Sequence, residues 1–341
     1  MGPATTPAHV TEAYRVGVRT RGTWLYIDMK IPNVAAALIV LLALTACEGE
    51  KAAAPPGDSG RSDRPTASAS PAPADLTTCP KSGIALWIGE TSAAMGLRSM
   101  NVELYNCGGR NRVLKGYPQI KLLDVDRRPI KASAKPGSSS VATVDSYDRP
   151  PRRVTLKPGE VASAGVLWRN LVTGDAAEAV TAEFMEIAPL PGEPTDQLPG
   201  VGIDLGTTRK VGIGPWQKVR QAKDNKAGDN GPRPADLPAW LRRVQLGPAE
   251  RLVGELAFRR LYPELDRLRT QGGFTADSVR KALLGLGFSA DTTKATAAQA
   301  MQAVAFEVYP GQGACVHGTL QSTRLTAKVE GARVQGGCAD T

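Results

Sequence analysis

The sequence predicts a mainly β protein, in which a β-sandwich precedes a small α+β domain. Between residues 79 and 217, short apolar runs that alternate with polar residues recur, and turn residues separate them. After residue 236, apolar residues first recur at helical spacing and then alternate again towards the C-terminus. Helices followed by strands within one stretch of chain predict an α+β domain with an antiparallel sheet.

An apolar segment lies unusually far from the start of the chain. It runs for 11 residues, from Val34 to Leu44, whereas a membrane-spanning helix needs about 20 residues. A basic residue, Lys30, precedes it and small residues follow it, as is typical of an export signal. We therefore predict a signal peptide at residues 29–46. Residues 1–28 then come from a start codon assigned too early, or they form a long n-region.

The end of this segment, Leu44-Thr45-Ala46-Cys47, resembles the lipobox of bacterial lipoproteins. In that motif the cysteine sulfur carries a diacylglycerol, and cleavage leaves the cysteine as the first mature residue. The resemblance implies a lipid anchor at Cys47, on the extracytoplasmic face of the bacterial cell membrane; the alternative is a buried cysteine in an apolar helix. Residues 47–78 are rich in Ala, Pro, Gly and Ser, and we expect a disordered tether there.

The chain is basic, with 42 Lys and Arg against 33 Asp and Glu, and a net charge of +9. Residues 1–46 hold four basic and two acidic residues, so the processed chain would carry a net charge of +7. Such a charge near a membrane favours anionic lipids or anionic wall polymers. The basic residues are scattered, however, as on an ordinary solvated surface, and no nucleic acid is expected outside the cell.

The cysteines besides Cys47 number four: Cys79, Cys107, Cys315 and Cys338. An even number in an exported chain predicts two disulfides. Three pairings can be drawn, and the sequence-local pairing keeps each bridge within one compositional block. Each bridge would then close a short loop and stabilise its domain by roughly 3 kcal/mol.

About seven strands are predicted for the sandwich, and Trp87, Tyr117 and Trp168 are expected in or near its core. The second predicted strand shows the pattern clearly, because Met100, Val102 and Leu104 alternate with polar neighbours. The strands are expected at residues 83–89, 98–107, 119–125, 152–156, 161–170, 182–189 and 209–216.

Several of these pieces, in this order, resemble a family of unknown-function domains found in actinobacterial lipoproteins and secreted proteins. Cys79 precedes the first strand, a later strand ends in "YNC" at Cys107, and "LKGYP" (114–118) and "LKPGEVASAGVLWRN" (156–170) follow. The resemblance covers about 140 residues. It implies an immunoglobulin-like sandwich with a Cys79–Cys107 disulfide, and it implies no catalytic residues.

The second domain is expected at residues 236–341, after a polar linker at residues 218–235. One helix is predicted from Pro248 through Leu261, with a new turn at Pro263, and a second helix follows Thr275 as its N-cap. A three-stranded antiparallel sheet completes the domain, with strands at residues 303–310, 313–320 and 324–331. This region resembles, more weakly, another uncharacterised actinobacterial secreted module.

Two motifs suggest chemistry but fit it poorly. "GIDLGTT" (202–208) resembles the first phosphate-binding loop of actin-like ATPases, but it follows a β-rich block and no second loop comes after it. We expect a turn leading into the last strand, and no nucleotide. Cys315 and His317 would share one face of a strand and, with Cys338, could offer metal ligands or a Cys–His nucleophile. Both ideas need a free Cys315, so a disulfide is expected instead, with no metal and no cofactor.

Carboxylate pairs could in principle serve a glycosidase. The pairs Glu183 with Glu186 and Asp124 with Asp126 are expected on strands, where acidic residues are usually solvated.

The sequence therefore predicts a lipid-anchored cell-envelope protein that binds or scaffolds through sandwich loops or a sheet edge, without catalysis. Its expected partners are the membrane, an envelope protein or an anionic wall polymer. The alternatives are an envelope hydrolase with an unrecognised site and a sensor that works with a membrane protein.

Overall fold

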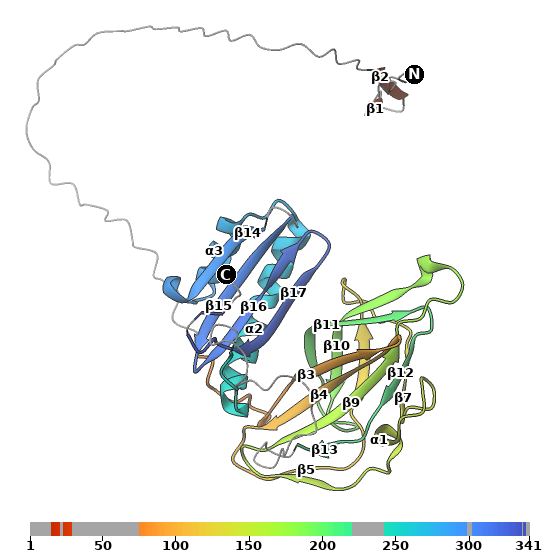
Figure 1. The fold of residues 1–341 in the computed structure, drawn as a ribbon, viewed down its shortest axis with the longest axis vertical. Coiled ribbons are helices and arrows are strands. Elements are labelled where there is room, and N and C mark those ends of the chain that lie inside the picture. Colours follow the sequence, from red (N-terminus) through yellow and green to blue (C-terminus); the bar gives the residue numbers. More distant parts are fainter. Residues whose placement is uncertain are drawn as a thin grey trace, which may run out of the picture. The chain divides into compact units, whose positions relative to one another are not determined.

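The computed structural model describes residues 15–20, 23–28, 75–219, 242–298, 302–335 and 337–338 (Figure 1). The predicted signal peptide, Cys47 and most of the predicted tether and linker lie outside these residues. The chain divides into two units, residues 1–66 and 67–341. In the first unit, β1 (Arg15–Thr20) and β2 (Thr23–Asp28) form an antiparallel hairpin.

Two main sheets form the β region, residues 79–219. The larger sheet has the order β3-β4-β9-β12-β7, with β13 beside β9, and the smaller sheet has the order β11-β10-β6. All pairs are antiparallel except β12 with β7. The strands of the larger sheet are β3 (Ile84–Ala94), β4 (Leu97–Asn106), β7 (Ser133–Pro136), β9 (Val161–Arg169), β12 (Lys210–Ile213) and β13 (Gln217–Lys218). Those of the smaller sheet are β6 (Gln119–Leu123), β10 (Val180–Ala188) and β11 (Asp196–Gly206).

Three short elements complete the β region. A two-stranded sheet joins β5 (Arg112–Leu114) to β8 (Val154–Leu156), and α1 (Asp145–Asp148) and the 3-10 turn η1 (Ala176–Glu178) lie in connections.

The two main sheets share one hydrophobic core, which confirms the prediction of a mainly β protein. The predicted alternation places Met100, Val102 and Leu104 of β4 in this core. Trp168 of β9 is buried there, and Tyr117 packs against it while partly exposed. A strand with one apolar face buries that face against a second sheet because apolar area leaves water.

Strand β11 corrects the prediction for residues 202–208. A turn was expected there, but the strand continues through Gly206 and the turn follows it. Ile203 and Leu205 are buried on one face, and Gly202 and Asp204 alternate with them. Burial in this segment therefore alternates with the two-residue period of a strand, although its glycine and aspartate residues are typical of a turn.

The C-terminal α+β region contains two helices and a four-stranded antiparallel sheet with the order β14-β15-β16-β17. Only three strands were predicted, because β14 is a run of small residues, KATAA after Thr293, with no large apolar side chain. The elements are α2 (Pro248–Gln271), α3 (Ala276–Gly285), the 3-10 turn η4 (Ala290–Thr292), β14 (Thr293–Ala298), β15 (Ala303–Gly311), β16 (Ala314–Gln321) and β17 (Leu325–Gly331).

Helix α2 is continuous through Pro263, where a new turn was predicted. Proline removes one backbone hydrogen bond from a helix interior. Leu261, Tyr262 and Leu265 are buried on both sides of it, and this burial offsets the loss. Helix α3 begins as predicted, because the Thr275 side chain accepts a hydrogen bond from the backbone N–H of Ser278.

Helix α2 is buried because it packs on two surfaces at once. Phe258, Leu261 and Leu265 share a cluster with strands of the α+β sheet and with Leu123 and Phe184 of the β region. Gly254 lies so close to β17 that a Cβ there would meet a Val329 methyl carbon at 2.3 Å. The helix therefore connects the α+β sheet to the β region.

The two disulfides are those of the sequence-local pairing, Cys79–Cys107 and Cys315–Cys338. Cys315 and Cys338 are both buried, together with Ala332. In the part of the chain that the structure describes, no helix is both long and apolar enough to cross a membrane.

Candidate binding cleft and sheet edges

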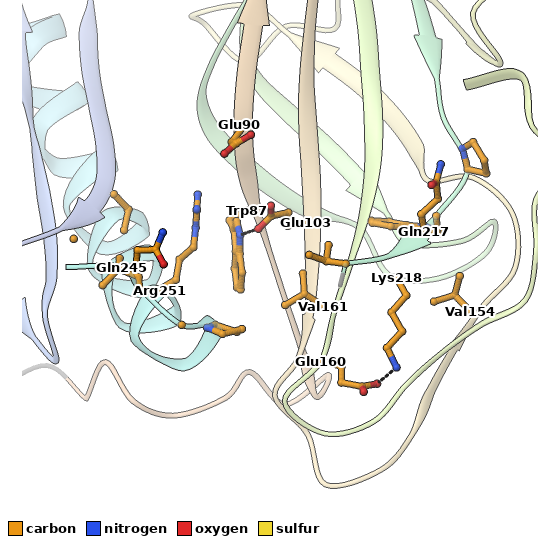
Figure 2. Close-up of a pocket in the computed structure, with 18 of the residues that line it drawn as sticks. Trp87, Glu90, Glu103, Val154, Glu160, Val161, Gln217, Lys218, Gln245 and Arg251 are labelled. Carbon is orange, nitrogen blue, oxygen red and sulfur yellow. Dashed lines mark hydrogen bonds and ion pairs between the residues drawn. The ribbon is translucent and has the colours of Figure 1, made fainter. Parts of the chain in front are cut away.

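A cleft lies where α2 meets the β region. Its volume is about 1980 Å³, and we call it the junction cleft (Figure 2). The β region contributes Trp87, Glu103 and Lys218 to its lining, and the α+β region contributes Gln245 and Arg251. The cleft therefore joins residues that are far apart in the sequence.

Trp87 lines the cleft and belongs to β3, whose first residues are apolar on both faces. Leu86 points into the core between the sheets, while Trp87 points outward and is buried, with 1% exposure, next to Leu252 of α2. The indole Nε1 donates a 2.6 Å hydrogen bond to Glu103 Oε2. The guanidinium carbon of Arg251 lies 5.6 Å from the indole ring centre, so a cation–π contact holds the helix against the strand.

Three charged residues of α2, spaced four apart, run along the side that faces the outer edge of β3. Arg251 Nη2 donates to the carbonyl of Ile88 at 2.7 Å, and Arg259 Nη2 donates to the carbonyl of Leu86 at 2.5 Å. Glu255 lies between the two arginines in sequence and accepts from Arg251 Nε at 3.3 Å. We call these three side chains the arginine ladder. It occupies backbone acceptors that a neighbouring strand would otherwise use.

Burial governs the ionisation of the ladder's acidic residue. It raises the pKa of Glu255 to about 7, because the charged carboxylate loses its water, while Arg251 and Arg259 partly oppose the shift. The nearby Glu103 raises the pKa further. Arg259 also binds Asp196 Oδ1 and Oδ2 at 2.8 and 2.7 Å, which ties α2 to the start of β11.

Glu330 of β17 is the other charged centre at the junction. It accepts from Arg243 Nε at 3.0 Å, lies 3.2 Å from His317 Nε2, and also pairs with Lys328. These partners stabilise the carboxylate, and the hydrogen bond to His317 contributes most to lowering the pKa of Glu330 to about 2. Glu330 therefore stays ionised and fixes three cationic or polar side chains.

A narrower groove of about 730 Å³ adjoins the cleft, and we call it the edge groove. One wall is β3 from Ile88 to Thr91, where the pairing with β4 is interrupted by a bulge. The other wall is β17 from Ala327 to Glu330, which is an edge strand of its sheet. Glu255 and Phe258 of α2 also line the groove. Two sheet edges therefore line one groove.

The residues that sequence analysis singled out as chemical candidates do not come together in one site. Cys315 is in a disulfide, and His317 pairs with Glu330. Among the described residues, no group of three or more His, Cys, Asp or Glu side chains is placed to hold a metal ion. Cys47 lies outside the described residues.

The carboxylates expected to be solvated on strands need two corrections. Burial raises the pKa of Glu183, whose side chain lies 3.9 Å from Arg324, so this residue is not simply solvated. Asp124 and Asp126 lie in the turn after β6 and not on a strand. Asp124 accepts backbone hydrogen bonds there, at 2.9 Å from Asp126 and 2.8 Å from Arg128. Its role is to hold the turn.

Sequence analysis missed the arginine ladder. Its only signal is charge at residues 251, 255 and 259, a spacing that usually marks the solvent face of a helix. The arginine ladder differs from such a solvent face because it packs against the outer edge of β3, and only the tertiary structure reveals this contact.

Comparison with known proteins identifies the β region. No curated protein and no solved structure matches the chain. A family model does match, over residues 79–221, and its description is domain of unknown function (DUF4232). The disulfide Cys79–Cys107, both main sheets and the β3 wall of the groove therefore belong to a DUF4232 domain.

Proposed function

We propose that the chain is a lipid-anchored protein of the bacterial cell envelope that binds another envelope component and is not an enzyme. The two disulfides indicate an extracytoplasmic protein, because such bonds persist in oxidising compartments. The finer parts of the proposal are the anchor at Cys47 and an immunoglobulin-like sandwich of the kind found in actinobacterial lipoproteins. They are supported by the sequence patterns described above.

The observation that carries the proposal is the junction cleft. Several of its polar side chains are already held by one another, as in the 2.7 Å ion pair of Lys218 with Glu160 and the hydrogen bond of Trp87 with Glu103. Side chains fixed in this way lose little conformational entropy when a ligand binds. A large, preorganised and open surface favours recognition of a macromolecule.

The partner is an envelope protein or an anionic wall polymer. Arg149 and Arg152 line the cleft and are exposed, and neither has a hydrogen bond or ion pair among the described residues. These two cations favour a partner that offers anionic groups.

The anchor is tested by cell fractionation of Cys47→Ala. The variant is expected in the soluble fraction or as an uncleaved precursor, because it has no sulfur to acylate. A mature, membrane-bound variant would contradict the lipid anchor.

Binding is tested with the purified full chain and two probes, protein-free cell-wall polymer and detergent-solubilised envelope proteins. Co-sedimentation measures the first and crosslinking followed by mass spectrometry measures the second. The proposal predicts saturable binding to one of them, and it fails if neither binds saturably.

A further inference from the structure

We infer that the edge groove binds an extended segment of a partner protein, which adds as a strand to the outer edge of β17. This inference rests on the proposed function, because it names the class of partner and the place where it binds.

The hydrogen-bond register of β17 shows which backbone groups face outward. Gln321 and Arg324 exchange backbone hydrogen bonds at 2.8 and 3.3 Å at the start of the β16–β17 pairing. Alternate residues along an antiparallel strand bond to the same neighbour, so Leu325, Ala327 and Val329 direct their N–H and C=O groups away from β16. The next such carbonyl, that of Gly331, accepts a 3.0 Å hydrogen bond from Arg243 Nη1, as this register requires.

Ala327 and Val329 line the edge groove, so their outward groups face it. No other described strand pairs with this edge. Strand β17 is regular over seven residues and contains neither a proline nor a bulge, two of the features that block a further strand. A row of unpaired N–H and C=O groups is the surface to which an extended peptide adds.

The β3 wall is closed to such pairing, which selects β17 as the acceptor. The arginine ladder occupies the carbonyls of Leu86 and Ile88, and a bulge follows at Gly89 and Glu90. Both devices block strand addition. The bulge therefore serves as the side wall of the groove, opposite the edge that binds.

The lining also restricts the sequence of the peptide. Side chains of a bound strand alternate between two faces, and one face would meet Leu198, Val201 and Phe258, which line the groove with 2%, 6% and 8% of their surface exposed. Glu90 is exposed at the groove, with no ion pair among the described residues. We therefore expect a segment that alternates apolar and polar residues and carries a basic side chain near Glu90.

The test begins with a phage-displayed library of random dodecapeptides, selected on the folded full chain. Enriched peptides are synthesised, and their affinity is measured by fluorescence polarisation. The inference predicts enrichment of alternating sequences with a basic residue. It is overturned if no peptide is enriched.

Two pairs of variants then separate groove binding from strand pairing. Ala327→Pro removes one outward N–H and is expected to weaken peptide binding about tenfold, whereas Ala327→Ser keeps the N–H and changes binding less than about twofold. Thr91→Trp fills the groove from its exposed wall. Ser92→Trp is its control, because Ser92 is also exposed, points to the opposite face and does not line the groove.

The outcomes distinguish this inference from the proposed function. Loss of binding in both Ala327→Pro and Thr91→Trp, with both controls intact, is the predicted result. Loss in Thr91→Trp alone shows a ligand in the groove that does not pair as a strand, and it overturns the inference but not the proposed function. If Thr91→Trp leaves peptide binding unchanged, the inference is also overturned. If Ala327→Pro does not fold, slower amide exchange of Ala327 and Val329 in the peptide-bound wild-type chain decides the question, and unchanged exchange overturns the inference.

Discussion

Replacing Glu255 by glutamine should abolish a pH dependence of stability that originates at the junction. Burial raises the pKa of Glu255 from 4.5 to about 7. In the unfolded chain the carboxyl group releases its proton near pH 4.5, whereas in the folded chain it holds the proton up to about pH 7. The stability that this group contributes is therefore complete below pH 4.5 and is lost as the pH rises through 7.

The size of the effect follows from the shift. One pKa unit corresponds to about 1.4 kcal/mol, so the wild-type chain should lose about 3 kcal/mol from this group between pH 4 and pH 8. Glutamine cannot ionise, so Glu255→Gln should show no such loss. The free energy of unfolding of Glu255→Gln minus that of the wild type should therefore be about 3 kcal/mol larger at pH 8 than at pH 4.

The assay is urea unfolding followed by tryptophan fluorescence at pH values from 4 to 8. The control is Glu264→Gln on the same helix, since the hydrogen bond with Arg267 lowers the pKa of Glu264 and no titration is expected in the upper part of this range. A free-energy difference between wild type and Glu255→Gln that does not change with pH would refute the burial argument.

Two further substitutions test how α2 is held. Gly254→Ala should destabilise the chain by about 1–3 kcal/mol, because its Cβ would overlap β17. The control, Gly285→Ala, has open space around its Cβ and should be neutral or stabilising. Thermal unfolding measures both variants, and equal effects would contradict the close approach of Gly254 to β17. Arg259→Met removes the bonds to Asp196 and Leu86 and should cost about 1–3 kcal/mol in urea unfolding, while Arg260→Met, on the exposed side, should cost less than about 0.5 kcal/mol. Similar losses for the two arginines would argue against the ladder.

Local patterns in the sequence predict most of the strands. The alternation of Met100, Val102 and Leu104 identifies a half-buried strand, because side chains on a strand alternate between two faces. Strand β14 was missed because its alanines and threonines carry no apolar period, and only pairing with β15 makes it a strand. Pro263 suggested a break in helix α2, because the loss of a backbone hydrogen bond at proline can be predicted from the sequence. The burial of the neighbouring side chains, which offsets this loss, cannot be predicted in the same way.

The site was less predictable than the fold. Trp87 could be assigned to a buried position, but the sequence does not show that it faces α2 instead of the core between the sheets. The outward backbone of Ala327 and Val329 carries no side-chain signature at all. Clefts and free strand edges depend on which elements meet, and the spacing of residues along one element does not contain that information.

The most direct test of the binding role uses a photo-crosslinking amino acid in living cells, placed at Lys328 or Lys294. These lysines lie on the two opposite edge strands of one sheet, their side chains are 62% and 65% exposed, and each pairs with a glutamate. Only Lys328 lines the edge groove. A discrete adduct with another envelope protein from position 328, and none from position 294, is the result predicted by strand addition of a partner protein in the edge groove. Equal adducts from both positions, or none from position 328, would contradict it.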